Sequence, residues 1–258
     1  MTKSPWHIPF GDATATPYYG AFFGRLGGVS VGHNASLNLG TGTGDDAETI
    51  EENGRRVLAT LGVERLALPR QVHEADVIVL DEPSAEGVSR LGDADAIMTT
   101  VPGQGVGVLT ADCVPVLLAD VQGRAVAAVH AGWRGLAAEV IGACVARMGE
   151  LGISANDLVA AVGPAIGPEA YQVDDALADR FAHEIPGGAG QVIRVPGRQP
   201  VIDLPSIAAS QLKAAGIDPA RVTVHRRSTA AEPDAFFSHR GQDGKAGRQL
   251  AAVALGRP

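Results

Sequence analysis

The chain has 258 residues and carries 21 Lys and Arg against 29 Asp and Glu, a formal net charge of −8. This length suffices for one large domain or two small ones with a buried core. The acidic balance, with a pI near 5.3, excludes a broad electrostatic surface for nucleic acid. No apolar run approaches the ~18 residues that cross a bilayer, so a membrane partner is also excluded.

The N-terminal stretch MTKSPWHIPFGD lacks the apolar centre of a secretory signal, which predicts a cytoplasmic protein. The two cysteines, Cys113 and Cys144, are then expected as free thiols rather than as a disulfide. Segments 87–93 and 186–190 are interpreted as surface loops, and neither is long enough to separate domains. We therefore expect a single domain over residues 1–258 and, by default, a monomer.

The first predicted elements are a strand at 17–23 and a polar, glycine-rich loop at 24–46. Loops longer than about 15 residues are uncommon in compact domains and are often functional, so this segment is a candidate part of a site. The spacing of Asp45 and Glu48 resembles a capping box and predicts a helix that ends near Gly62.

Apolar runs predict the remaining elements. Strands are expected at 66–72, 77–80, 96–99 and 105–110, and a β-hairpin at 114–118 and 124–129. A helix follows at 136–151, with Cys144 on its apolar stripe as an ordinary buried side chain. The rest of the chain predicts, in order, strand 158–162, helix 174–185, strand 192–195, helix 204–215, and strands 221–225 and 249–255. Because strands outnumber helices and several form neighbouring hairpins, we expect an α+β fold, a single domain with mixed β-sheets flanked by helices, rather than a Rossmann fold.

Three strings place a nitrogen or sulfur donor at the end of an apolar strand: Gln71-Val-His73, Thr110-Ala-Asp-Cys113 and Val129-His130. If the ends of these strands meet at one edge of a sheet, His73, Cys113 and His130 form a zinc site with two imidazoles and one thiolate. Three protein ligands leave a fourth position open, as in catalytic zinc sites. The intervals between the three residues match no local metal motif, so the residues alone leave open that each is an ordinary core or surface side chain.

Six strings occur together in one order along the chain: GGVS…SLNLG, RQVHEADV, TADCVPVLL, AVHAGWRGL, VGPAIGPEAYQV and FFSHR…GR. On these motifs the chain resembles the YfiH family, also called multicopper polyphenol oxidoreductases or laccase-domain proteins, over residues 22–255. The resemblance implies a single YfiH-like domain and a zinc site on His73, Cys113 and His130. It also implies a purine nucleoside phosphorylase that converts adenosine, inosine or methylthioadenosine with phosphate, and that deaminates adenosine as a side activity.

The proposed chemistry needs residues that bind phosphate and a nucleoside. Arg134, near the start of a helix, is a candidate for phosphate because a guanidinium there adds to the free N–H groups of the helix terminus. Arg25 and the pair Arg240 and Arg248 are further candidates. Trp133 is a candidate for stacking on the purine or for packing beneath the loop.

Other polar residues of the matched strings are candidates for smaller roles. Asp112 is a candidate catalytic residue that orients or accepts a proton beside Cys113. Ser36, Asn38 and Gln71 are candidates for contacts with ribose or the purine edge, and Ser36 and Asn38 are equally suited to capping their own loop.

The sequence departs from the family pattern at Gly54, where an arginine is usual, at Ser228, where a cysteine is usual, and at His239, where a tyrosine is usual. These changes bear on substrate preference more than on zinc.

Three other functions are considered. A copper-dependent phenol oxidase is disfavoured, because the chain has only 7 His and no His-x-His pair for a trinuclear copper centre. A cysteine hydrolase or amidase would use Cys113 as nucleophile and His130 as its base. A non-enzymatic binding module would not need an open metal position.

Overall fold

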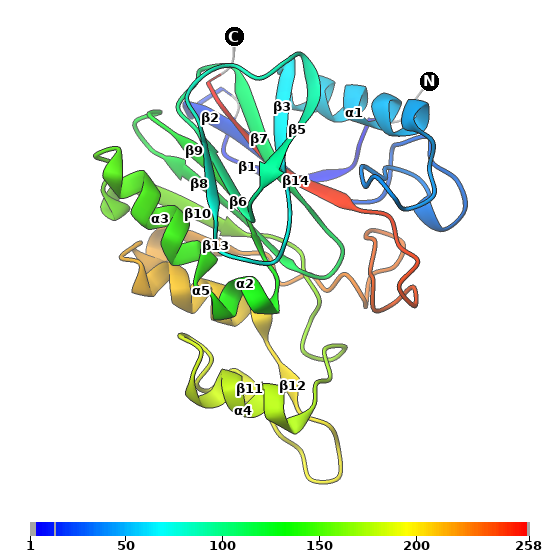
Figure 1. Ribbon diagram of the computed structural model, residues 1–258, viewed down its shortest axis with the longest axis vertical. Helices are drawn as coiled ribbons and strands as arrows, with labels where there is room; N and C mark the ends of the chain where they lie inside the picture. Colours follow the sequence, from blue (N-terminus) through cyan, green and yellow to red (C-terminus); the bar gives the residue numbers. More distant parts are fainter. Residues whose placement is uncertain (1–3, 13, 257–258) are drawn as a thin grey trace.

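Strands that are buried on both faces determine the architecture. Every residue of β8 (Val114–Asp120) and β9 (Val126–Ala131) is buried. Such strands are continuous apolar runs because each of their two faces packs against another layer. The computed structural model describes residues 4–12 and 14–256 and contains two large sheets with helices on both outer sides (Figure 1).

The first sheet has the strand order β1-β2-β14-β7-β3-β5 and the second has the order β13-β10-β8-β9-β6-β4. In the first sheet these strands are β1 (His7–Phe10), β2 (Tyr18–Phe23), β14 (Gln249–Leu255), β7 (Gln104–Thr110), β3 (Arg65–Arg70) and β5 (Gly87–Asp93). The second sheet adds β13 (Val222–Val224), β10 (Leu158–Val162), β6 (Ala96–Thr99) and β4 (Val77–Leu80) to β8 and β9. Both sheets mix parallel and antiparallel pairs, which confirms the predicted fold class.

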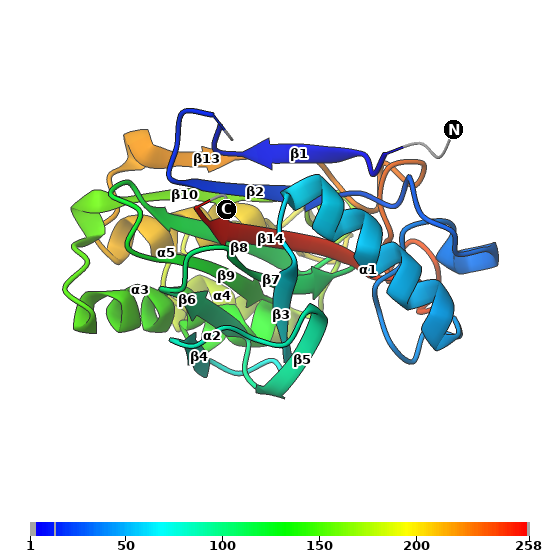
Figure 2. The same cartoon turned by 90° about the horizontal axis from the view of Figure 1, so that it is seen from above.

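The two sheets pack face to face, and one apolar cluster contains Phe22 and Val106 of the first sheet with Leu117 and Ala128 of the second. The helix α1 (Ala47–Leu61) covers the outer face of the first sheet, as Figure 2 shows. The outer face of the second sheet is covered by α3 (Val140–Glu150) and α5 (Leu204–Ala214). The resulting order of layers is helix, sheet, sheet, helix.

A smaller lobe lies at one end of the molecule (Figure 1). It contains α4 (Asp175–His183) and the short antiparallel pair β11 (Val192–Ile193) and β12 (Val201–Ile202). Segment 186–190 is a loop of this lobe, as predicted. No helix within residues 4–12 and 14–256 combines the length and hydropathy of a membrane span. The domain prediction also includes residues 1–3, 13 and 257–258, which lie outside the described residues.

The helix predicted to end near Gly62 is α1, and its cap differs from the expectation. Asp46, rather than Asp45, accepts the first free backbone N–H, from Thr49 at 2.7 Å. Asp45 instead accepts from the side chain of Asn38. The helix ends at Gly62, whose φ of 70° is the left-handed conformation that favours glycine.

The helix predicted at 136–151 is two helices, α2 (Trp133–Ala137) and α3. Glu139 between them has a φ of 58°, which breaks the helix and changes its direction. Leu136 and Val140 on either side of the break both remain buried, so the apolar spacing alone does not reveal it. Cys144 is fully buried, and burial raises the pKa of its thiol to about 12, which confirms its structural role.

The interpretation of 87–93 as a surface loop is wrong, because this segment is β5, the edge strand that pairs parallel with β3. Its residues are half-buried or exposed, so it lacks the apolar run that revealed the central strands. The sequence analysis also missed β1 and β12. The segment 24–46 is a loop, as predicted, with one short 3₁₀ turn at Gly32–Asn34.

Candidate metal centre

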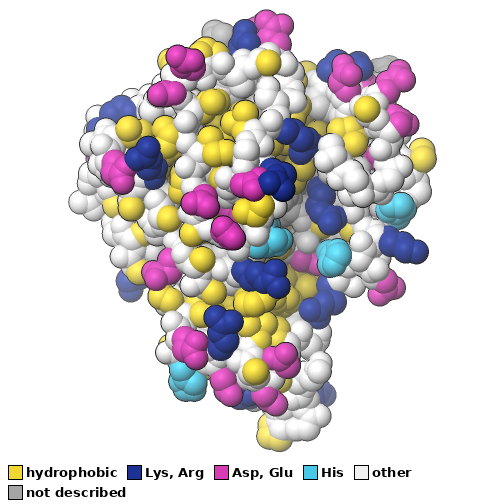
Figure 3. Space-filling view, viewed as in Figure 1, with side chains coloured by type: hydrophobic (Ala, Val, Ile, Leu, Met, Phe, Trp, Pro, Cys, Tyr) yellow, Lys and Arg dark blue, Asp and Glu magenta, His cyan; other side chains and the backbone are white. Residues whose placement is uncertain are grey.

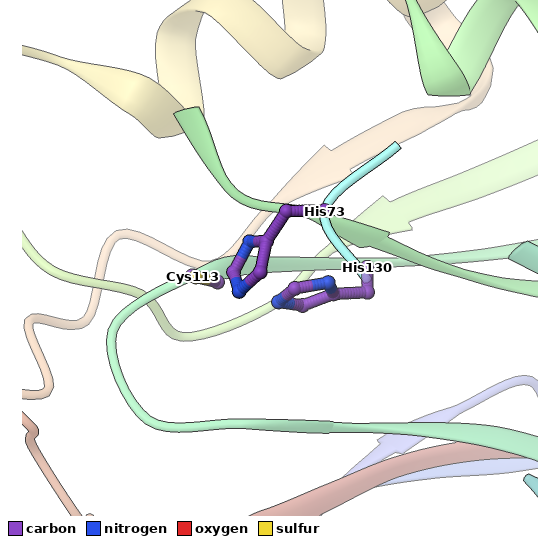
Figure 4. A group of neighbouring side chains, drawn as sticks. All are labelled: His73, Cys113 and His130. Atoms are coloured by element: carbon purple, nitrogen blue, oxygen red, sulfur yellow. The ribbon is translucent and has the colours of Figure 1, made fainter. Parts of the chain in front are cut away.

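Three side chains from separate parts of the chain meet at one end of the paired sheets (Figure 4). His73 follows β3, Cys113 lies between β7 and β8, and His130 lies in β9. Their possible ligand atoms all lie within 4.8 Å of one another. The expectation that the strands end at one sheet edge needs correction: β3 belongs to the first sheet, and β8 and β9 to the second. The residues meet because the two sheets are stacked.

Asp95, which the sequence analysis missed, holds two of the three donors in place. Its fully buried carboxylate accepts a hydrogen bond from His130 Nδ1 at 2.7 Å. The other carboxylate oxygen accepts from the backbone N–H groups of Val72 at 3.1 Å and Glu74 at 2.8 Å, on both sides of His73. Metal-binding histidines typically donate their second nitrogen to such a carboxylate. The only sequence signal was an acidic residue directly before the buried strand β6.

The charges of the group set the protonation of its histidines. Burial alone would lower the pKa of His130, but the negative charge of Cys113 and the hydrogen bond to Asp95 raise it to about 9. The pKa of His73 is below its usual value because of burial and the neighbouring charge of His130. Burial also opposes ionisation of Asp95, but the hydrogen bond from His130 keeps the pKa of that carboxyl below its usual range. The group therefore concentrates negative charge where a cation is able to replace the proton of His130.

Gly132 provides the space in which the donors meet. A Cβ atom at this position would lie 2.9 Å from His73 Nδ1 and 3.0 Å from Cys113 Sγ. Any other residue here would displace one or both donors. The two-nitrogen, one-sulfur set and its space fit a borderline-soft metal ion such as zinc. Across residues 4–12 and 14–256, this is the one group of such side chains close enough to hold a metal.

Asp112, a candidate catalytic residue, is hydrogen-bonded to the segment that follows β13. Its carboxylate accepts from Thr229 Oγ1 at 2.6 Å and from the backbone N–H of Arg240 at 2.6 Å. It therefore fastens the segment around 229–240 beside Cys113, and both of its oxygens are engaged there. The backbone of Asp112 has a φ of 91°, a strained conformation for a residue with a side chain.

A cavity of about 570 Å³ opens in front of His73, Cys113 and His130, the candidate metal-ligating group. Its walls include all three candidate ligands, Gly40 and Thr41 of the predicted loop, and the polar side chains of Gln71 and His239. Gln71 was a candidate for substrate contact, and it does line the cavity. Its amide group, however, is bound at both ends to the backbone of Leu109, with distances of 2.7 and 2.8 Å.

Arg90 and Arg248 contribute positive charge to this cavity. Arg90 donates to the carbonyl of Leu39 at 2.6 Å, and Arg248 donates to the carbonyls of Ala246 and Gly247. Neither guanidinium forms an ion pair with a carboxylate among the described residues, and Arg248 feels the more distant negative charges of Cys113 and Asp112. Arg90 was missed because it lies in the segment misread as a loop. Figure 3 shows histidine and dark-blue Lys or Arg side chains gathered around the hollow at the centre of this face.

The other candidate arginines lie outside the cavity walls. Arg25 donates to the carbonyls of Ala35 and Pro233. Arg240 donates to the carbonyls of Ala170 and Gln172. Arg134 is exposed and lies over the ring of Trp133 at 5.2 Å, close enough for its charge to lower the pKa of His73. Trp133 itself packs partly against the apolar core of the second sheet.

Ser36 and Asn38 are bound within the loop. Ser36 Oγ accepts from Gly28 N–H at 3.1 Å and donates to the carbonyl of Arg25 at 3.0 Å. The buried amide of Asn38 donates to Thr43 and Asp45 and accepts from the backbone of Gly40 and Arg248. The contacts of Ser36 and Asn38 therefore stabilise the conformation of their own loop, which the sequence analysis gave as the alternative to substrate contact.

Comparison with known proteins agrees with this description. Residues 20–256 match the family described as multi-copper polyphenol oxidoreductase laccase. The chain belongs to this family. A Xylella fastidiosa protein named purine nucleoside phosphorylase is 38% identical over 240 residues, covering 89% of this chain and 88% of that protein. The Geobacillus stearothermophilus purine nucleoside phosphorylase YlmD is 35% identical over 252 residues, covering 93% and 92%.

Among solved structures, the Bacillus licheniformis hypothetical protein YfiH superposes with a TM-score of 0.89 at 25% identity, covering 99% of this chain and 98% of that one. The fold predicted from the motifs is therefore confirmed over almost the whole chain.

Proposed function

We propose that this chain is a zinc-dependent purine nucleoside phosphorylase, which converts adenosine, inosine or methylthioadenosine and phosphate into the free base and the pentose 1-phosphate. The names of its relatives support this reaction. The observation that carries the proposal is one cavity in which three metal donors lie together with two arginines that have no carboxylate partner among the described residues.

His73, Cys113 and His130 would hold the zinc ion. A zinc ion at such a site supplies a Lewis acid and lowers the pKa of a bound water. Asp95 accepts the Nδ1 proton of His130 and so keeps the Nε2 atom of the neutral ring available for the metal. The donor set and the single group among the described residues favour zinc over the several copper ions of a laccase.

Arg90 and Arg248 are proposed to bind the phosphate, in place of Arg25, Arg134 and Arg240. Guanidinium groups bind phosphate through two parallel charge-assisted hydrogen bonds. In the reaction, a phosphate oxygen forms a bond to C1′ of the pentose while the bond from C1′ to the purine nitrogen breaks. The two arginines neutralise the attacking dianion and hold it in place, which brings the reactants together at a high effective concentration.

Deamination of adenosine is proposed as a side activity of the same cavity: the oxygen of a water forms a bond to C6 of adenine while the bond from C6 to the exocyclic nitrogen breaks, and that nitrogen leaves as ammonia. This part of the proposal depends on the family resemblance. It predicts inosine both with and without phosphate, whereas phosphorolysis depends on phosphate.

The test is an incubation of zinc-quantified protein with adenosine, with and without phosphate, followed by chromatography. We expect adenine and ribose 1-phosphate only when phosphate is present. Arg248→Met should raise the KM for phosphate, whereas Arg147→Met, which removes a surface arginine paired with Glu150, should leave it unchanged. Base release that is independent of phosphate would contradict the proposal.

A second candidate has one structural observation in its favour. Asp95, His130 and Cys113 stand in the order orienting carboxylate, base and thiol that a cysteine hydrolase uses. If metal-free protein hydrolyses amide substrates, and iodoacetamide blocks this activity by alkylating Cys113, the hydrolase is the better assignment. If zinc protects Cys113 from iodoacetamide and removal of zinc yields no amidase activity, the phosphorylase stands.

A further inference from the structure

A second cavity, of about 290 Å³, lies between α1 and β5. Its apolar walls are Leu39, Ile50, Leu58 and Val88. Thr41 and Arg90 line both this space and the larger cavity over the metal-ligating group, so the two cavities are neighbours with a common wall. Figure 1 shows α1 and β5 side by side at the upper edge of the molecule, and residues of these two elements line the cavity.

Gly54 keeps this second cavity open. It lies inside α1, where glycine destabilises a helix relative to alanine. Nothing in the backbone requires glycine here, because a Cβ atom would meet only the side chain of Val88, at 3.0 Å from Cγ2. A longer side chain at this position would extend into the space that Ile50 and Leu58 border. The glycine at this position therefore lowers the stability of α1 and leaves the apolar space unfilled.

Arg90 gives the cavity one charged end. Arg90 is exposed, and its guanidinium donates one hydrogen bond, to the Leu39 carbonyl at 2.6 Å. Its remaining N–H groups have no partner among the described residues, and the cavity presents apolar side chains on the other side. A cation at the end of an apolar space is complementary to an anion that carries an apolar group. The acidic side chain on the rim, Glu51, is exposed and lies 3.9 Å from Arg55.

We propose that this cavity binds small amphipathic carboxylates, with the apolar group between α1 and β5 and the carboxylate on Arg90. Because Arg90 is also proposed to bind phosphate, such a ligand competes with phosphate and not with the nucleoside. Only this kinetic consequence rests on the proposed function; binding itself does not.

The binding test uses 3-phenylpropanoate, its neutral amide and acetate on the full chain. Methyl NMR and calorimetry report where and how tightly each binds. We expect 3-phenylpropanoate to shift the methyl signals of Ile50, Leu58 and Val88, and to bind at least about tenfold more tightly than the amide, since it alone makes charged hydrogen bonds to Arg90. Acetate, which lacks the apolar group, should not shift these signals. Equal affinity for acid and amide, or shifts confined to other methyl groups, would overturn the proposal.

Gly54→Leu fills the cavity and should abolish the methyl shifts and the binding heat while leaving phosphorolysis unchanged. Gly149→Leu is the matched control, because Gly149 is also a helix glycine but has open space around its Cβ position. If Gly54→Leu is poorly folded, Arg90→Met gives the same answer from the charged end, and loss of the preference for acid over amide is expected. Retained binding in Gly54→Leu, or a retained preference for acid over amide in Arg90→Met, would overturn the assignment.

The kinetic arm separates this inference from the proposed function. Competition of 3-phenylpropanoate with phosphate supports both. Methyl shifts without any phosphorolysis by the protein would support the cavity and contradict the phosphorylase. Phosphorolysis without methyl shifts would support the phosphorylase and contradict carboxylate binding in the second cavity.

Discussion

Replacing Asp95 with asparagine removes the group that links two of the proposed ligands. The carboxylate accepts three hydrogen bonds, from His130 Nδ1 and from the backbone N–H groups of Val72 and Glu74. An asparagine has one acceptor oxygen, so its NH₂ group must face either the imidazole N–H or the two backbone donors. With the NH₂ group toward Val72 and Glu74, buried donors oppose one another. With the NH₂ group toward His130, the imidazole must carry its proton on Nε2, the atom proposed to bind the metal.

The size of the effect follows from these contacts. Each buried donor left without a partner costs about 1–3 kcal/mol, so the metal-free Asp95→Asn protein should lose about 1–3 kcal/mol or more in its free energy of unfolding. Loss of the carboxylate behind a metal-binding histidine typically lowers metal affinity by about 10- to 100-fold. The two effects arise at the same residue, because the carboxylate orients His130 and fixes the turn that carries His73.

Zinc affinity should be measured by competition with a chelating indicator, and stability by urea unfolding of the metal-free protein. Asp120→Asn is the matched control. Asp120 is also fully buried and carries hydrogen bonds, from Arg124, but it belongs to the far end of β8. This control should lose stability and keep its zinc affinity. If Asp95→Asn binds zinc within twofold of the unsubstituted protein, Asp95 does not orient the metal-ligating group and the argument fails.

Two further predictions concern a glycine and an acid transition. Gly132→Ala should prevent metal binding while the fold is retained, because the added methyl group would occupy the space beside His73 Nδ1 and Cys113 Sγ. A zinc content equal to that of the unsubstituted protein would contradict this prediction. The hydrogen bonds from Arg124 hold the pKa of Asp120 below the usual aspartate value of 3.8. The stability from this pair should therefore be complete above that value and decline as the pH falls through the lower, folded-state pKa. Urea unfolding between about pH 5 and pH 2 should show a shallower acid decline in Asp120→Asn, and an unchanged slope would contradict the assignment.

The central layers of the fold were predictable because their strands are continuous apolar runs. Strands 77–80, 96–99, 158–162 and 249–255 have the predicted bounds. The edge strand β5 was not predictable, because its half-exposed residues show no apolar run, whereas the edge strand β4 is itself a short apolar run. The break at Glu139 escaped for another reason: a change of helix direction leaves the burial of neighbouring residues intact.

Some residues of the candidate site were also predictable from the sequence, and others were not. His73, Cys113 and His130 were proposed from their places at the ends of apolar strands, and the family resemblance implied that they form one site. Their meeting depends on the stacking of two sheets, which local spacing does not encode. Asp95 and Arg90 were missed because their importance comes from long-range contacts, to His130 and to the shared cavity wall, respectively.

The candidate anion-binding residues show the limit of reading chemistry from residue type. Arg25, Arg240 and Arg248 all donate to backbone carbonyls, but of the three only Arg248 lines the cavity. An arginine in a motif looks the same in sequence in either case. Only the position of the side chain relative to the cavity separates the two roles.

The central claim is that the group of His73, Cys113 and His130 holds the metal on which phosphorolysis depends. The most direct test returns zinc stepwise to chelator-treated protein while the release of ribose 1-phosphate from inosine is followed, with Cys113→Ala as the comparison. The account predicts that activity returns in proportion to bound zinc, saturates at a single ion per chain, and does not return in Cys113→Ala. Full phosphorolysis by the metal-free protein would contradict the account.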